Sequence, residues 1–238
     1  MSEAENIEIR HLLESTRLFA GLGKDTIQAI ASSGVIKAYS PDTYLFLQGD
    51  PAERIYILIT GRVKLSQVTP EGQNVILRYV GPGEAFSVIA VLAEMKSPVS
   101  AEVVEPSRLI SWNKDTFKDL MLRFPHLALN NLAVLAARTR EFQDRIRELA
   151  TERVERRIAR TILRLARQTG RKVPEGILLG LSITRQEIAE LAGTTLFTVS
   201  RTISQWENQG VIKAGREEII ILQPHQLVAI AEDLPLSE

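Results

Sequence analysis

The spacing of hydrophobic positions changes twice along the chain. Apolar residues recur at helical steps over the first 20 residues and again over residues 22–33, which predicts two short helices. Between Val35 and Trp112 the pattern becomes short alternating or apolar runs, separated by turn signals about every ten residues. This spacing predicts an antiparallel β-sandwich or roll, interrupted by a short helical stretch over Ser87–Glu94.

Helical spacing returns at Lys114, and a long helix is expected from about His126, after the break at Phe124-Pro125. One row on this helix advances by three and four residues alternately, through Leu132, Leu135, Thr139, Phe142, Ile146 and Leu149. Such a row predicts a seam along which two helices pair. The alternative is an ordinary amphipathic helix packed on its own domain, but the charged residues along the other faces favour a dimer helix.

Residues 151–170 predict a further helix, whose arginines we interpret as a solvated face. A turn-rich connection is expected over Gly170–Gly180. The next stretch, Ile183–Gly210, is ITRQEIAELAGTTLFTVSRTISQWENQG, and its pattern is typical of a helix-turn-helix.

Within this stretch, Thr184 and Glu187 have the spacing of a capping box at the start of the first helix. Gly193 supplies a positive φ for the turn. The second helix has an apolar stripe through Val199, Ile203 and Trp206, and its other face carries Thr195, Thr198, Ser200, Arg201 and Gln205. Two short helices of this kind place the second one in the major groove of DNA, so we predict DNA recognition.

The segment that follows, VIKAGREEIIIL, predicts a β-hairpin with its turn at Ala214–Arg216. A hairpin directly after a helix-turn-helix is a wing. Lys213 and Arg216 are expected where a wing meets phosphate.

Composition narrows the function classes. The chain has 238 residues, 45% hydrophobic content and zero net charge, so it is long enough for two folded domains but not globally basic. It has no cysteine, which excludes disulfides and cysteine-ligated iron–sulfur clusters. Neither a secretion signal nor a membrane span is evident, and a cytoplasmic location is expected.

The order of a β-roll, a long helix and a winged helix-turn-helix resembles the CRP/FNR family of bacterial transcription regulators. The resemblance rests on ITRQEIAELAG with TVSR after it, and on the β-roll segments GDPAERIYILITGRVKLSQVTPEGQ and YVGPGEAF. It implies a regulator, not an enzyme, that binds double-stranded DNA as a homodimer at a palindromic site and works with RNA polymerase. The implied fold is α+β: a cyclic-nucleotide-binding-like jelly roll over 1–125, a dimerisation helix over 126–150, and a winged helix-turn-helix over 151–238.

The resemblance also assigns residue roles. The family's Thr-Arg-Gln touches the DNA backbone, and Arg201 matches an arginine that reads guanine, for which a guanidinium can donate two hydrogen bonds. The alternative for Arg201 is a solvated helix charge. The complete predicted set is Thr184, Arg185, Gln186, Thr195, Phe197, Thr198, Ser200, Arg201, Gln205, Lys213 and Arg216.

Phe197 departs from the family pattern, because many members have a glutamate there that accepts a hydrogen bond from cytosine. A phenyl ring cannot accept that bond, but it can lie against a thymine methyl. The alternative is that Phe197 packs on its own domain. The string TTLFTVSR resembles the branch that regulates denitrification and nitric-oxide responses, the NNR, NnrR and DNR group.

The effector is not fixed by the sequence. Family members that bind cAMP use a Gly-Glu-Leu run and a downstream Arg-Ser, whereas here Ser87-Val88-Ile89 and Val99-Ser100 occupy those places, so we expect no cAMP binding in the usual way. Haem with a gas ligand, a small apolar or acidic metabolite, and no ligand at all remain open. A cavity lining is expected from Phe86, Val88, Ile89, Val91 and Leu92, unless these residues are simply core.

The sequence also bears on two other function classes. A metal dioxygenase on the β-roll needs clustered histidines, but none lies between His11 and His126, so no metal site is predicted. His11 and His126 are also the candidate axial ligands for haem, whereas His225 lies beyond the wing. The second class is a regulatory subunit that binds a ligand and a protein partner but no DNA, and the wing and recognition helix favour DNA instead.

Overall fold

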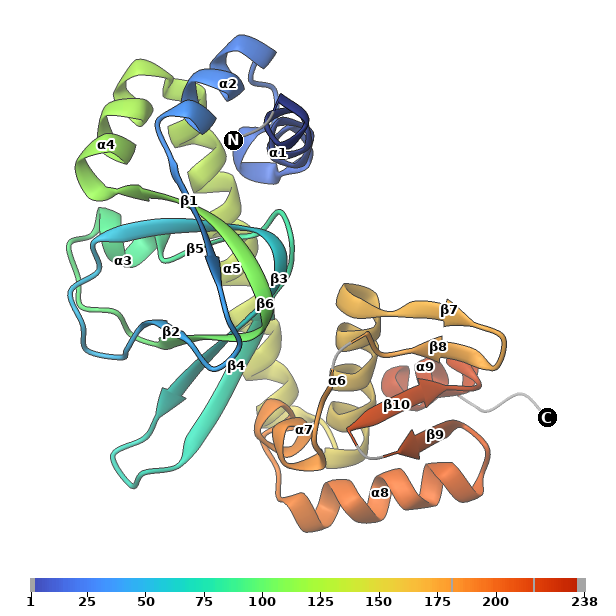
Figure 1. Ribbon diagram of the computed structural model, residues 1–238. Coiled ribbons are helices and arrows are strands. Elements are labelled where there is room, and N and C mark those ends of the chain that lie inside the picture. The colour runs from blue at the N-terminus through green and yellow to red at the C-terminus, as the bar shows by residue number, and fades with distance from the viewer. Residues whose placement is uncertain (1–2, 181, 216, 235–238) are drawn as a thin grey trace. The chain divides into compact units, whose positions relative to one another are not determined.

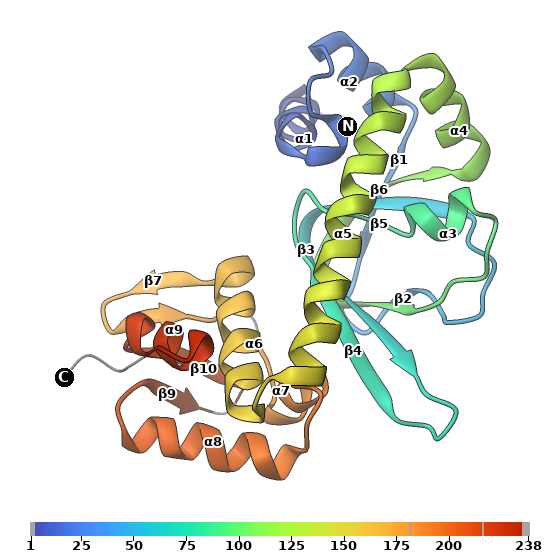
Figure 2. The same cartoon turned by 180° about the vertical axis from the view of Figure 1, so that it is seen from behind.

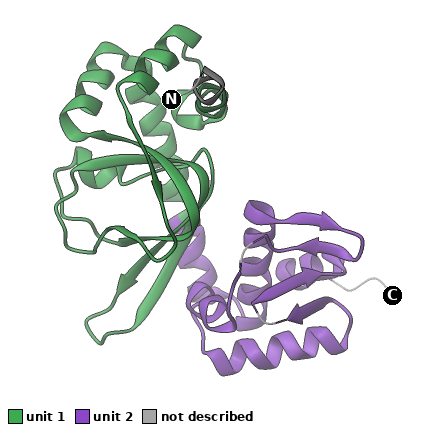
Figure 3. Ribbon diagram, in the orientation of Figure 1, with its two compact units in different colours: residues 1–141 green, residues 142–238 purple. Residues whose placement is uncertain are grey.

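The structure is a computed structural model that describes residues 3–180, 182–215 and 217–234. The chain divides into two compact units, Met1–Glu141 and Phe142–Glu238 (Figure 3). No single helix of the described ranges is long and apolar enough to cross a membrane. Two consecutive helices, α4 (Lys114–Arg123) and α5 (Pro125–Thr151), reach the required length and apolar character only when they are taken together. The angle between them at the break is 112°.

The first unit is built on an antiparallel β-roll (Figure 1). Its remaining helices are α1 (Glu3–Ser15), the 3-10 turn η1 (Arg17–Phe19), α2 (Lys24–Ser32) and α3 (Val88–Leu92). Its strands are β1 (Val35–Tyr39), β2 (Tyr44–Phe46), β3 (Arg54–Val68), β4 (Asn74–Val80), β5 (Ala85–Phe86) and β6 (Ser100–Asn113). The strand order is β1-β6-β3-β4, with β2 paired to β6 and β5 paired to β3, so the predicted β-roll is confirmed.

The long strands β3 and β6 pair along most of their length, and their register shifts around Gly61. Gly61 has φ +88°, and a Cβ atom there would lie 2.2 Å from the Ser107 Oγ atom. Only glycine allows both this conformation and this close approach of the two strands.

Alternation along β3 sends neighbouring side chains into two different cores. Ile55 and Ile57 belong to a cluster with α1, α2 and α4, which also holds Trp112. Tyr56 and Leu58 point into the roll, where they pack with Phe86. The apolar run of β3 is continuous because both of its faces are buried.

The second unit contains the end of α5 and the helix-turn-helix (Figures 1 and 2). Its helices are α6 (Val154–Thr169), α7 (Arg185–Ala192), α8 (Leu196–Asn208) and α9 (Pro224–Glu232). Its strands are β7 (Arg171–Val173), β8 (Gly176–Leu178), β9 (Ile212–Gly215) and β10 (Glu218–Ile221), in the antiparallel order β7-β8-β10-β9.

Two expectations for this unit need correction. The segment Gly170–Gly180 is not only a connection, because it forms the hairpin β7–β8, and β8 pairs with β10 of the wing. The wing turn comes one residue later than predicted, since Gly215 pairs with Glu218. Arg216 lies outside the described residues.

The sequence suggested that the arginines of α6 form a solvated face. In the structure, some of them are instead paired with carboxylates. Arg164 donates to the Glu148 carboxylate at 2.8 Å, and Arg160 donates to Glu152 at 3.0 Å. Both carboxylates belong to the segment where α5 ends, and the Glu148 side chain is only 8% exposed. These ion pairs fasten the end of α5 to α6.

Candidate nucleic-acid interface

The first helix of the motif, α7, begins with the predicted capping box. The Thr184 hydroxyl accepts a hydrogen bond from the Glu187 N–H at 3.1 Å, and the Glu187 carboxylate accepts one from the Thr184 N–H at 2.9 Å. Both donors would otherwise have no partner in the helix, so the box fixes where α7 starts.

The turn after α7 is held from two sides. Gly193 adopts the left-handed conformation, with φ +60° and ψ +49°. The Arg157 guanidinium of α6 donates to the carbonyls of Ala192 at 3.1 Å and Gly193 at 3.0 Å. The same guanidinium donates to the Glu152 carbonyl at 3.0 Å, so one side chain joins the α5–α6 turn to the turn of the motif.

The second helix, α8, has one buried and one exposed face. Val199, Ile203 and Trp206 are fully buried, and the Trp206 Nε1–H donates to Glu155 of α6 at 3.2 Å. This packing directs the opposite face to solvent. The exposed residues of α8 are Leu196, Phe197, Arg201, Ser204, Gln205 and Asn208.

Two side chains on this exposed face are available for contact with a partner. Arg201 has neither a hydrogen-bond nor an ion-pair partner among the described residues, so its five donors remain available. The Phe197 side chain is 75% exposed and does not pack on its own domain. A free guanidinium and an exposed ring, one helical turn apart, can reach a base edge and a methyl group.

Other predicted contact residues already form an ion pair or a hydrogen bond with a neighbouring side chain. Arg185 lies 3.4 Å from Glu207, and Gln186 donates to Glu190 at 3.1 Å. Lys213 lies 3.4 Å from Glu175 of the β7–β8 turn. These contacts are exposed or partly exposed, and exposed ion pairs are weak enough to open for a phosphate.

The predicted residues Thr195 and Thr198 bond each other at the start of α8. Thr195 is the N-cap of α8, and its hydroxyl accepts from the Thr198 N–H at 3.2 Å. The two hydroxyls are themselves 2.9 Å apart. Ser200 is half-buried beside the exposed face.

Sequence reasoning missed three exposed residues of α8, namely Leu196, Ser204 and Asn208. Ser204 and Asn208 follow Phe197 and Arg201 along the exposed side of the helix. The helical period alone could have identified them, because they lie three and seven residues after Arg201.

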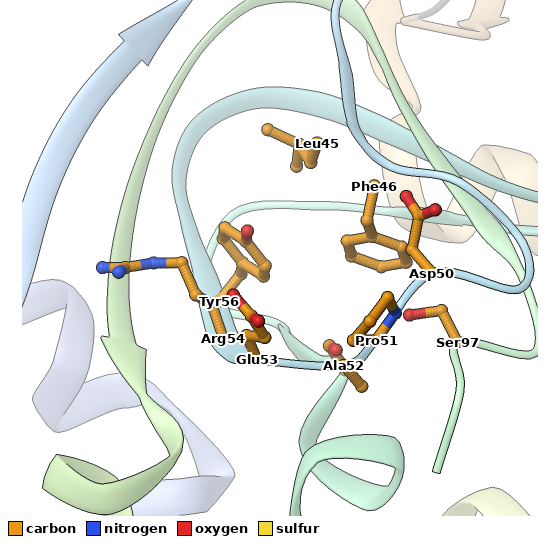
Figure 4. Close-up of a pocket in the computed structure, with 10 residues that line it drawn as sticks. Leu45, Phe46, Asp50, Pro51, Ala52, Glu53, Arg54, Tyr56 and Ser97 are labelled. Atoms are coloured by element: carbon orange, nitrogen blue, oxygen red, sulfur yellow. The ribbon is translucent and has the colours of Figure 1, made fainter. Parts of the chain in front are cut away.

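The β-roll has a cavity of about 340 Å³ next to α3. It is lined by Leu45, Phe46, Asp50, Pro51, Ala52, Glu53, Arg54, Tyr56, Ser87 and Ser97. Figure 4 shows Tyr56 across from Phe46, Asp50 and Ser97, while the Arg54 guanidinium points away from them. The Ser97 hydroxyl is buried and has no hydrogen-bond partner within the described ranges.

The five residues expected to line an effector pocket are not part of this lining. Phe86 is buried inside the roll, where it stacks on Tyr56 with ring centroids 5.2 Å apart. Val91 is buried in the other cluster, with Val88 and Leu92 packed against it, and Ile89 is exposed. Four of the five therefore pack in the cores, and none of the five lines the cavity beside Tyr56 and Ser97.

Neither candidate haem ligand adjoins the cavity. His11 lies on α1 with its Nδ1 atom 3.3 Å from Glu14, and His126 is exposed in the first turn of α5. Within the described part of the chain, histidine, aspartate and glutamate side chains form no group of three that could hold a metal ion.

The predicted seam on α5 is open to solvent in the single chain. Leu132 is 62% exposed and Ile146 is 67% exposed, and Leu135, Thr139, Phe142 and Leu149 are exposed as well. A row of large apolar side chains at this spacing is a surface that another helix can cover.

Two parts of the chain match known families. Residues 36–124 match the family described as Cyclic nucleotide-binding domain, and residues 156–230 match the family described as Crp-like helix-turn-helix domain. The Cyclic AMP receptor protein of Thermus thermophilus is 30% identical over 219 residues, which cover 92% of this chain and 98% of that protein. The Global nitrogen regulator of Synechococcus elongatus is 29% identical over 191 residues, covering 79% and 86%.

A solved structure shares the fold. FixK2 from Bradyrhizobium japonicum superposes with a TM-score of 0.72 at 22% sequence identity, covering 86% of this chain and 98% of that one.

Proposed function

The chain belongs to the CRP/FNR family of DNA-binding transcription regulators, and we propose that it acts as a homodimer on a palindromic site in double-stranded DNA. One observation carries the proposal: α8 presents an unpaired Arg201 beside an exposed Phe197, on the face opposite its buried stripe. Arg201 donates to the O6 and N7 atoms of guanine, and Phe197 lies against a thymine methyl. The string TTLFTVSR and its Phe197 support a finer assignment, to the NNR, NnrR and DNR branch.

The phosphate contacts in this proposal come from around α8. Thr184, Arg185 and Gln186 at the start of α7, together with Lys213 and Arg216 of the wing, set the register on the backbone. Arg185 and Lys213 exchange their glutamate partners for phosphates on binding. Thr195, Thr198, Ser200 and Gln205 complete the surface that faces the groove, and Ser204 and Asn208 extend it.

The apolar row on α5 supports the homodimer, because a second copy of the same row covers it. A twofold axis then places two copies of α8 about 34 Å apart, in successive major grooves. A DNA target places the dimer in the cytoplasm, and RNA polymerase is the expected protein partner. A regulatory subunit that binds no DNA would leave the Crp-like helix-turn-helix domain without a role.

The β-roll is proposed as a sensor that does not take cAMP in the usual way. Between Ser87 and Ser100 the chain has no arginine to pair with a cyclic phosphate, and an unpaired buried phosphate is costly. The cavity beside Tyr56 and Ser97 offers hydroxyl groups and aromatic rings instead. Mass and absorption spectra of the purified protein distinguish three cases: bound haem, another bound small molecule, and no effector at all.

Selection of a preferred duplex from a random library, followed by titration, tests the DNA-binding proposal. Arg201→Ala is expected to lose about 1–3 kcal/mol on the selected duplex and little on random DNA. The matched control is Arg167→Ala, which removes an exposed arginine from α6 and should leave both affinities unchanged. Equal losses on both duplexes would show that Arg201 touches only the backbone, and binding that does not weaken with salt would contradict DNA recognition altogether.

A further inference from the structure

Three charged side chains from different elements meet where α5 lies against the roll. Arg78 comes from β4, Glu84 from the turn before β5, and Arg138 from α5. The Glu84 Oε1 atom accepts hydrogen bonds from Arg78 Nη1 at 3.0 Å and from Arg138 Nη2 at 2.7 Å. Its Oε2 atom accepts from the Gly81 N–H at 2.8 Å. All three residues belong to the first unit.

The group is partly buried and contains more positive than negative charge. The side chains of Arg78, Glu84 and Arg138 are 20%, 30% and 22% exposed. The second carboxylate near Arg138, that of Glu141, is 59% exposed and bonds a different guanidinium nitrogen. Burial alone would raise the pKa of Glu84, but the Arg78 charge, the Gly81 N–H and Arg138 together hold it below its ordinary value. The carboxylate is therefore ionised, and both arginines bond it.

We propose that Arg78 and Arg138 form a carboxylate-binding site between the roll and α5, and that Glu84 fills it as a built-in ligand. The geometry is that of carboxylate recognition, in which guanidinium groups and a backbone N–H converge on two oxygens. Glu84 is already tethered in place by the Gly81 turn, so it binds without losing the translational freedom that an external anion would lose. A small carboxylate takes this place when Glu84 is removed.

The site is one of the contacts that fix the rotation of α5 about its own axis against the roll. Arg138 and the proposed dimer row lie on the same helix, and Thr139 of that row is the next residue. The Glu84 contact thus helps to orient the part of the row that belongs to the first unit, Leu132 to Thr139, without any soluble effector. Its consequence for DNA affinity rests on the proposed function, whereas the anion site itself does not.

Chemical rescue tests the site. Glu84→Ala should lower the melting temperature by roughly 3–8 °C, because it leaves two guanidinium groups without their carboxylate. Sodium formate should recover part of this loss, whereas sodium chloride at the same ionic strength should not. The control Glu141→Ala removes the exposed carboxylate from the same arginine and should give no formate-specific gain. The double variant Glu84→Ala with Arg138→Gln should lose the rescue.

Equal effects of formate and chloride on Glu84→Ala would overturn the proposal. If that variant does not fold, Glu84→Gln and Arg138→Gln in a double-mutant cycle replace it, and additive losses in melting temperature then overturn the proposal. A second readout is operator affinity, which Glu84→Ala should reduce on the order of tenfold and formate should restore. A wild-type protein that binds no DNA would refute the proposed function, while the melting experiment would still decide the anion site.

Discussion

Phe197 is the residue at which the proposed DNA recognition departs most from the family pattern. Its ring is exposed at the start of α8, on the same face as Arg201. With 75% of its surface exposed, Phe197 packs little against its own unit, and its ring is available to a partner surface. In a major groove, the apolar partner that a base offers is the thymine C5-methyl group.

Replacing single thymines of the selected duplex by deoxyuridine tests this contact, because the change removes only the methyl group. At one position per half-site the wild-type protein should lose about 0.5–1 kcal/mol, the transfer value of one methyl group. Phe197→Ala should bind both duplexes equally at that position. Leu196→Ala, at the neighbouring exposed apolar residue, serves as the control and should keep the preference for thymine. A thymine preference that survives in Phe197→Ala would assign the contact to another residue.

At the scale of elements, the helix-turn-helix was predictable in detail because its signals are local. The Thr184–Glu187 box, the glycine turn and the stripe of α8 each lie within a few residues of sequence. The hairpin β7–β8 was not predictable in the same way. Its strands have three residues each, too few to show a two-residue period, and the pairing partner of β8 lies some 40 residues further on.

The candidate site residues show the same difference between local signals and long-range packing. Exposure of Phe197 and Arg201 follows from the helical period of α8, so both could be found from sequence. The expected effector residues could not, because the packing of α3 and β5 decides whether Phe86 and Val91 line a cavity or fill a core. The partners of Arg138 and Glu148 are likewise distant in sequence, and these charges looked like parts of a solvated helix face.

The pairing of α5 with α6 through Glu148 gives a prediction about pH. Burial alone would raise the pKa of Glu148, but its bonds to Arg164 and Arg145 bring it below the ordinary value. The pair therefore stabilises the second unit at neutral pH, and this stabilisation is lost as pH falls below about 4.3 and through the folded-state pKa. Glu148→Gln should cost about 1.5–3 kcal/mol at neutral pH, and its difference from wild type should shrink in acid.

Urea unfolding at a series of pH values measures this, with Trp206 fluorescence in a Trp112→Phe background reporting on the second unit. Asp144→Asn is the control, because Asp144 is 65% exposed and its pair with Arg147 should contribute almost nothing. A gap between wild type and Glu148→Gln that stays constant into acid would mean that the destabilisation does not come from the ionised carboxylate.

At the scale of the whole molecule, the proposed function depends on the number of copies that bind DNA together. One α8 reads only a few base pairs, so a single chain would discriminate poorly between sites. Two copies related by a twofold axis double the contact and add a fixed spacing, which a palindromic site matches. The row on α5 has the length and spacing for this pairing.

Ile146→Glu places a charge within this row, where pairing would bury it without a partner. Sedimentation should show a dimer for the wild type and a monomer for Ile146→Glu at the same concentration, and operator affinity should fall by at least tenfold because the half-sites no longer act together. The control Leu122→Glu makes the same chemical change on α4, at a side chain that is 81% exposed and outside the row, and should stay dimeric. If Ile146→Glu remained a dimer that bound its operator, the two copies would have to join through another surface, and the twofold placement of α8 would no longer follow from α5.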